Sequence, residues 1–250
     1  MASIKPKHSR IKYVEEAGFN INYSENSRDI KYDVAMEYTR GSGKYHSDTI
    51  IISSSSAFNC CCKNICNCRA FCYANRDERS HGHKVTEYKD RQGYEFLHTP
   101  NSEIVRDFIE MQKNFQKPIT QVRLNEAGDL SKEFLLKVYN LQQEFQKHES
   151  LKEIIFFTYT HNYMLYSEIE PLLNSHFIVN NSYNPEAPTQ RTLSNNYIAV
   201  EEHIYNYIAS MPQHKLDQFN IVICDCREKC NTNCNACMLN NGKNIIVKIH

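Results

Sequence analysis

The chain has 250 residues, of which 41% are hydrophobic, and its 29 Lys and Arg residues balance 29 Asp and Glu residues to a net charge of zero. This length predicts one or two domains with enough apolar side chains for a core. The neutral charge argues against a protein that coats nucleic acid, because neutralising phosphates needs an excess of basic side chains.

Nothing in the sequence resembles a membrane span or a signal peptide. The longest strongly apolar runs, 50–52 and 154–157, fall far short of the roughly 20 residues that cross a bilayer. The first ten residues are basic and lack the apolar region of a signal peptide. We therefore expect a cytoplasmic protein without a membrane partner.

Residues 1–48 are predicted to form an N-terminal antiparallel β extension. Apolar and polar residues alternate over 30–39 and again over 19–23, which is the period of a half-buried strand. The polar run 24–28 between them suits a hairpin loop. A short buried strand is then expected over Thr49 to Ile52, followed by a loop at the serines 53–56.

Residues 49–250 are predicted to form a single α/β domain. Further strands are expected at 119–124, 153–159, 177–181, 219–224 and 245–249, and helices from Pro100 onward and over 131–146, 163–173 and 200–211. Strands that alternate with helices of this length form parallel sheets. Because about six strands are fewer than the eight of a closed barrel, we expect a partial, open TIM-type βα barrel, with a doubly wound sheet as the alternative.

The 11 cysteines form two clusters, with six between residues 60 and 72 and five between 224 and 237. A secreted disulfide scaffold spreads its cysteines along the chain, and a reducing cytoplasm disfavours disulfides. We interpret both clusters as metal-binding loops.

The spacing within the clusters favours iron–sulfur chemistry. The first has no C-x2-C pair of the kind that binds zinc, and its spacings of six and three residues suit a loop around an iron–sulfur cluster that leaves one iron open. The C-x3-C-x2-C loop of radical S-adenosylmethionine enzymes is absent, so S-adenosylmethionine is a less favoured ligand. The second cluster contains one C-x2-C pair and fits either iron–sulfur or zinc.

Carboxylates follow the strand predicted at 119–124. Glu126 and Asp129 lie in a strand-to-helix turn, which is the ligand-binding end of parallel α/β folds, and Gly128 between them allows a ligand to approach the backbone. The two carboxylates could hold a cofactor or act as acid and base. Alternatively, Asp129 or Ser131 only caps the following helix.

Several other polar residues allow either a functional or a structural interpretation. Arg123 and Gln121 share one face of their strand, where Arg123 meets either a ligand or a carboxylate. Thr158 and Thr160 face a barrel lumen or make structural hydrogen bonds, which we favour. The His-Gly-His segment 81–83 lies in a charged stretch, for which a solvated loop is favoured over a metal site.

Three motifs spanning residues 60–237 resemble the phage gene product 88 family. They are Cys61-x6-Cys68-x3-Cys72 followed by Tyr73-Ala74, the segment 123–130 (RLNEAGDL) with 157–160 (FTYT), and the strand 221–224 that leads to Cys234-x2-Cys237. The resemblance implies a phage-encoded, radical-SAM-like barrel that carries iron–sulfur clusters in the infected host cell, with no settled reaction.

Two functional hypotheses follow, and they share one set of candidate residues. In the first, an enzyme binds a small molecule at a [4Fe–4S] cluster held by Cys61, Cys68 and Cys72, and one or two clusters are present in all. In the second, a non-catalytic interaction or structural protein uses iron–sulfur or zinc sites as staples. The candidate metal ligands are Cys61, Cys68, Cys72, Cys224, Cys230, Cys234 and Cys237, with Cys60, Cys62, Cys66 and Cys226 as extra thiols; the candidate cofactor-binding residues are Arg123, Asn125 and Thr160, and the candidate catalytic residues are Glu126 and Asp129.

Overall fold

The computed structural model describes residues 2–4, 36, 38–40, 48–57, 59–60, 72–81, 83–115, 117–125, 127–162, 165, 168, 170–182, 195–224, 236–239 and 242–248. The strand expected over 19–23, the hairpin loop 24–28 and most of the helix expected over 163–173 lie outside these residues. Within the described part, residues 170–172 form a short 3-10 helix, η5 (Glu170–Leu172).

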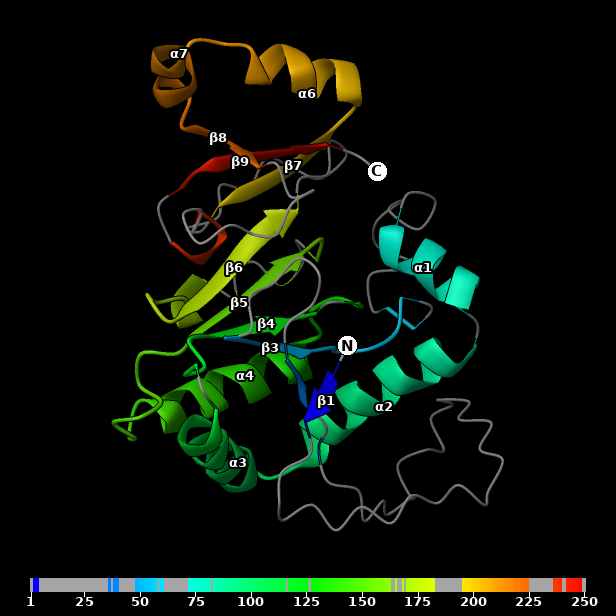
Figure 1. Cartoon of the computed structure of the whole chain (residues 1–250), viewed down its shortest axis with the longest axis vertical. Coiled ribbons are helices and arrows are strands. Elements are labelled where there is room, and N and C mark those ends of the chain that lie inside the picture. Colours follow the sequence, from blue (N-terminus) through cyan, green and yellow to red (C-terminus); the bar gives the residue numbers. More distant parts are fainter. Residues whose placement is uncertain are drawn as a thin grey trace.

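A nine-stranded mixed sheet crosses the described part of the molecule (Figure 1). Its spatial order is β1-β2-β3-β4-β5-β6-β7-β9-β8, in which β1, β2 and β3 pair antiparallel and all pairs from β3 to β8 are parallel. The strands are β1 (Ala2–Ile4), β2 (Tyr38–Arg40), β3 (Thr49–Ile52), β4 (Gln121–Leu124), β5 (Ile155–Thr160), β6 (Phe177–Ser182), β7 (Asn196–Val200), β8 (Ile221–Cys224) and β9 (Asn244–Lys248). Among the described residues no pairing joins β1 to β8, so the seven parallel strands form an open α/β sheet, and closure of a TIM-type barrel is not confirmed.

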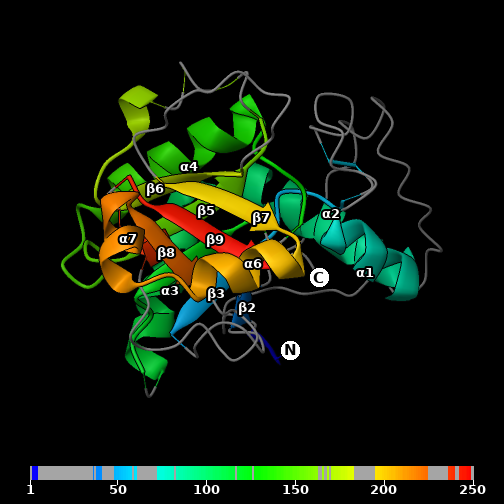
Figure 2. The same cartoon turned by 90° about the horizontal axis from the view of Figure 1, so that it is seen from above.

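Two predicted helices pack on one face of the sheet, where α3 and α4 lie side by side (Figures 1 and 2). The apolar stripe predicted from Pro100 onward becomes the buried face of α3, and the stripe predicted over 131–146 becomes that of α4. Ser131 caps α4, because its Oγ accepts the Phe134 N–H at 3.1 Å. The helices are α1 (Tyr73–His81), α2 (His83–His98), α3 (Asn101–Asn114), α4 (Lys132–Phe145), α6 (Glu202–Ala209) and α7 (Gln213–Gln218), with a 3-10 turn η6 (Ala236–Met238).

Aromatic rings link these helices to the sheet in the main core. Phe145 of α4 lies 4.9 Å from Phe108 of α3 and 5.1 Å from Phe156 of β5, centroid to centroid. Tyr38 of β2 meets Phe108 edge-on and donates its hydroxyl to Asp107 at 3.1 Å. Each fully buried ring contributes roughly 2 kcal/mol. These contacts therefore hold the helices against one face of the sheet. The candidate site lies outside this core, at the carboxyl ends of the parallel strands.

Two sequence predictions were wrong. The stretch around His81 and His83 is helical, since His81 ends α1 and His83 begins α2, and Glu78 within α1 is only 2% exposed. Charged residues there suggested solvent, but Glu78 pairs internally with Lys89 at 3.5 Å. The start of the helix expected over 200–211 was also wrong. The helix is confirmed as α6 (Glu202–Ala209), but residues 196–200 before it pair with β6 and β9 as the strand β7.

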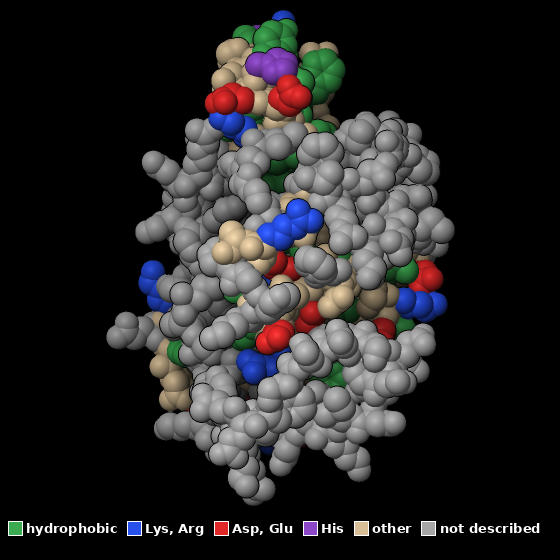
Figure 3. Space-filling view, turned by 90° about the vertical axis from the view of Figure 1, so that its right-hand side faces the viewer, with side chains coloured by type: hydrophobic (Ala, Val, Ile, Leu, Met, Phe, Trp, Pro, Cys, Tyr) green, Lys and Arg blue, Asp and Glu red, His purple; other side chains and the backbone are tan. Residues whose placement is uncertain are grey.

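Helix α6 lies at the far end of the molecule and contacts β9, which is the neighbour of the edge strand β8 (Figure 1). It buries none of its side chains, and Tyr207 is 68% exposed. Hydrophobic side chains accordingly show at this end of the surface, next to a histidine and acidic groups (Figure 3). None of the helices in the described ranges is long and apolar enough to cross a membrane.

Candidate functional site

Three backbone N–H groups after β3 are held by side chains of the α1–α2 pair. Ser53 N donates to Gln92 Oε1 at 2.8 Å and Ser56 N to Asp90 Oδ1 at 2.6 Å. Ala57 N donates to Glu78 Oε1 at 2.8 Å. These bonds fix residues 53–56, which we call the serine loop, at the carboxyl end of β3 and just before the first cysteine cluster.

Asp90 accepts hydrogen bonds from two residues at this end of β3. Besides Ser56, it accepts a hydrogen bond from Asn59 Nδ2 at 2.7 Å. Burial raises the pKa of Asp90 above its usual range, against the opposing effect of the Ser56 and Asn59 hydrogen bonds, which lower it. Ionising this carboxyl therefore costs free energy in the folded chain.

The turn after β4 packs directly on the serine loop. Gly128 has φ +75°, and a Cβ there would lie 2.3 Å from Ser55 Oγ. Ser54 Oγ donates to the Asp129 carbonyl at 3.0 Å. The space that Gly128 provides, which we expected a ligand to use, is occupied by the serine loop.

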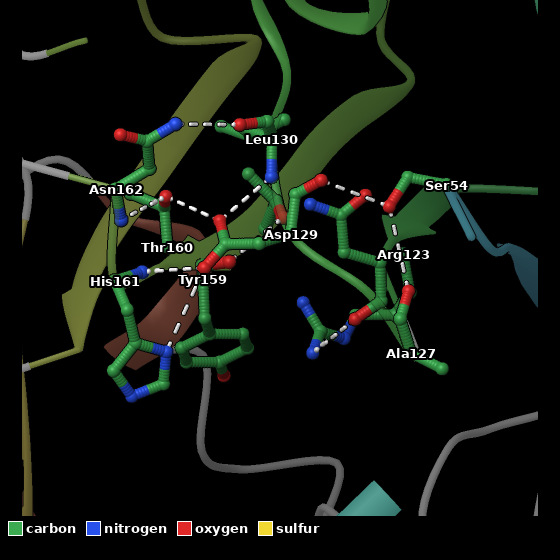
Figure 4. A network of polar contacts seen from close by, with 11 residues as sticks. Ser54, Arg123, Ala127, Asp129, Leu130, Tyr159, Thr160, His161 and Asn162 are labelled. Atoms are coloured by element: carbon green, nitrogen blue, oxygen red, sulfur yellow. Dashed lines mark hydrogen bonds and ion pairs between the residues drawn. The ribbon is translucent and has the colours of Figure 1, made fainter. Parts of the chain in front are cut away.

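Asp129 is the centre of a buried hydrogen-bond network between β4 and β5 (Figure 4). Its Oδ1 accepts the Leu130 N–H at 2.6 Å and the Thr160 hydroxyl, and its Oδ2 accepts the His161 N–H at 2.8 Å. Thr160 Oγ1 in turn accepts the Asn162 N–H at 2.9 Å. A carboxylate bound in this way is held in one orientation, and it locks the ends of the two strands together.

On the face of the sheet opposite the main core, the Arg123 side chain lies beside two aromatic rings. The Arg123 guanidinium lies 4.2 Å from the Tyr159 ring centroid and 5.6 Å from that of Phe157. Arg123 faces away from Val122 and Leu124 as predicted, since those two lie in the main core.

The hydroxyls of Thr158 and Thr160 make structural hydrogen bonds, as favoured from the sequence. The Thr160 hydroxyl donates to Asp129, and the hydroxyl of the buried Thr158 donates to the Tyr159 carbonyl at 3.4 Å.

Asn125 follows β4 in the left-handed region, with φ 56°. Its N–H donates to the Ile52 carbonyl at 2.8 Å, and its own carbonyl accepts from Arg123 at 3.3 Å. Asn125 therefore lies against the end of β3 and next to Arg123, whereas Glu126, the other acid expected in this turn, lies outside the described residues.

Described cysteines of both clusters flank this edge of the sheet. Cys72, immediately before α1, packs with Ala57, Ala74 and Ala127, and Ala127 belongs to the Asp129 turn. Cys237 is 8% exposed and packs in a second apolar cluster that Tyr159 joins. Cys72 thus lies beside the turn after β4, and Cys237 lies beside β5.

A buried asparagine pair holds residues 236–239, at the end of the second cysteine cluster. Asn180 Nδ2 donates to the Cys237 carbonyl at 3.0 Å, and Asn195 Nδ2 donates to Asn180 Oδ1 at 2.8 Å and to the carbonyls of Ala236 (3.0 Å) and Leu239 (2.8 Å). The sequence predicted a loop at residues 53–56 but not its contacts, and it gave no sign of the asparagine pair, because both depend on contacts that only the fold brings together.

The remaining candidate ligands Cys61, Cys68, Cys230 and Cys234 lie outside the described residues. Cys224 is in a disulfide, whereas Cys72 and Cys237 are not. In the described part of the chain, no three His, Cys, Asp or Glu side chains gather as a metal site. A complete ligand set would therefore need cysteines from the undescribed segments.

The described residues define an α/β protein with an open parallel sheet and polar turns at the carboxyl ends of its strands. A profile of the family described as gene product 88 matches residues 26–217. The chain therefore belongs to the gene product 88 family. No curated protein and no solved structure matches it.

Proposed function

We propose that this phage protein binds iron–sulfur clusters with its two cysteine loops and a small molecule beside them, at the carboxyl edge of the parallel sheet. The observation that carries the proposal is that one described cysteine of each cluster lies near the carboxyl end of one of two neighbouring strands. Cys72 packs with Ala127 after β4, and Cys237 shares an apolar cluster with Tyr159 of β5. Thiolates are the usual ligands of iron–sulfur clusters.

Small side chains surround the described cysteine of the first cluster. Cys72 is partly buried and packs with Ala57, Ala74 and Ala127. Cys61 and Cys68 would complete the first site. A bound cluster would supply an open iron for a small molecule, while Asp129 keeps the adjoining turn in place and Arg123 provides positive charge.

In this proposal, the seven parallel strands of the sheet form a partial barrel of the radical-SAM-like kind. Ligands of such barrels bind at the carboxyl ends of the strands. A second candidate is a non-catalytic role, in which the metal only staples the fold. The buried Asn180–Asn195 pair favours that role for the second cluster, because Asn180 fixes the Cys237 carbonyl by a hydrogen bond within the fold.

The test is the metal content of the full chain purified without oxygen. The proposal predicts a brown protein with iron and acid-labile sulfide in near-equal amounts. A colourless protein with stoichiometric zinc, or with no metal, contradicts it. Stoichiometric zinc would support the stapling role instead.

A further inference from the structure

The Asn125 side chain is buried with neither of its polar atoms paired. It is 4% exposed, and among the described residues neither Nδ2 nor Oδ1 has a hydrogen-bond partner. Its backbone, by contrast, is fixed on both sides by Ile52 and Arg123. An unpaired buried amide is rare in native proteins, and it indicates a missing partner at that place.

The backbone at Asn125 adds a second cost. Its φ of 56° is one that glycine adopts without strain, whereas a side chain adopts it at a cost. Glycine would remove both the strain and the unpaired amide. A residue that lowers stability in two ways, at the ligand-binding end of a strand, is a candidate for function rather than folding.

A flat cationic group lies next to Asn125. The Arg123 guanidinium, stacked on Tyr159 and bonded to the Asn125 carbonyl, provides a planar cationic group. A planar polar ligand suits such surroundings.

We propose that Asn125 binds a ligand group with a hydrogen-bond donor and an acceptor side by side, as found in a carboxamide and at the N6/N7 edge of adenine. An asparagine amide satisfies both of its polar atoms with such an edge. A carboxylate or phosphate would pair with Nδ2 alone and leave Oδ1 unpaired. The inference deepens the proposed function, on which it rests for the presence of a small-molecule site.

The experiment measures thermal shifts and calorimetric binding with the full chain purified without oxygen. The probes are adenosine, nicotinamide for the carboxamide, and purine riboside, which lacks the N6 donor and has only acceptors on its base. We expect adenosine or nicotinamide to raise the melting temperature and purine riboside to leave it unchanged. The absence of a shift with both adenosine and nicotinamide at millimolar concentration overturns the inference.

Two substitutions and one matched control separate ligand binding from structure. Asn125→Asp replaces the donor and should weaken binding by about tenfold or more. Asn125→Gly should abolish binding and raise the melting temperature of the ligand-free protein. Asn220→Gly, at an exposed position with φ 53°, relieves similar strain and should leave binding unchanged. If Asn125→Gly lowers the melting temperature and keeps the binding, the Asn125 side chain is structural and the inference is wrong.

Iron content, measured in the same samples, distinguishes the two proposals. Iron with sulfide but no binding of either probe contradicts the Asn125 assignment alone. Probe binding that depends on Asn125, in a protein without iron and sulfide, supports the assignment and contradicts the iron–sulfur proposal.

Discussion

Gly93 of α2 touches the backbone of Ser54 so closely that a Cβ on Gly93 would lie 1.9 Å from the Ser54 carbonyl oxygen. On its other side the serine loop presses against Gly128, where a Cβ would lie 2.7 Å from Ser54 Oγ. The loop is therefore wedged between two glycines that lie 35 residues apart in the sequence. The position of the first cysteine cluster depends on this wedge, because the cluster begins only four residues after the loop.

Gly93→Ala should destabilise the fold by about 1–3 kcal/mol, because the added methyl group would overlap the Ser54 backbone. That backbone cannot move without breaking the hydrogen bonds that hold the serine loop. Alanine otherwise favours a helix by about 1 kcal/mol, so any loss reports the crowding. Urea unfolding measures the change, and hydrogen exchange should become faster at the Ser53, Ser56 and Ala57 amides. Gly242→Ala is the control for strain without crowding, since φ is +65° there but nothing lies within 4 Å. It should lower stability through backbone strain and leave exchange at those three amides unchanged. Unchanged exchange in Gly93→Ala would contradict the wedge.

Asp90 should make stability depend on pH. Because burial raises its pKa in the folded chain, the stability linked to its protonated form is full below the ordinary Asp pKa of about 3.9 and is lost as pH rises through the raised value. Asp90→Asn removes this titration, and the Asn59 amide can turn to accept from the new amide. The free energy of unfolding of the wild type minus that of Asp90→Asn should fall as pH rises from acid toward neutral. A difference that is constant or rises with pH would show that burial does not govern this carboxyl.

Thr160→Val should cost about 2–3 kcal/mol although the two side chains have the same shape. The substitution removes the hydroxyl that bonds Asp129 and also leaves the Asn162 N–H unpaired. Thr160→Ser keeps the hydroxyl and loses only a methyl group, at about 1 kcal/mol. Denaturant unfolding of the two variants compares them directly. Equal stabilities would mean that the Asp129 network contributes little.

Asn195→Asp should destabilise the protein by at least about 3 kcal/mol, because it places a carboxylate against the three oxygens that Asn195 now binds. Asn196→Asp is the matched control. Asn196 is only partly buried, with Nδ2 on Asn244 Oδ1 at 2.9 Å, so its change should cost less than about 1 kcal/mol. Thermal unfolding of both variants tests whether the asparagine pair stabilises the fold. Similar melting temperatures for the two variants would contradict that role.

Local patterns predicted the elements that bury one face. The stripe over 131–146 and the cap at Ser131 fixed α4 almost to the residue, because both signals are short-range. The α1–α2 pair was missed because Glu78 and Asp90 are buried, and a buried, paired charge has the same sequence signature as a solvated one. Strand β7 was missed because its pairing with β6 and β9 decides its conformation.

The candidate site shows the same division. Arg123, Asn125, Asp129 and Thr160 could be found because they follow predicted strands, and parallel strands end at one edge. Their roles could not be predicted, since the contacts of Asp129 with Thr160 and His161 span more than thirty residues. Whether the cysteines bind metal stays a prediction.

The measurement that tests the account most directly is the iron content of the wild type, Cys72→Ser and Cys237→Ser, all purified without oxygen. If each loop holds metal at the carboxyl edge, each variant should lose iron and melt at a lower temperature, because metal-binding free energy is also folding free energy. Asn196→Asp, which leaves every cysteine in place, should keep the wild-type iron. Wild-type iron content and melting temperature in both cysteine variants would contradict the account.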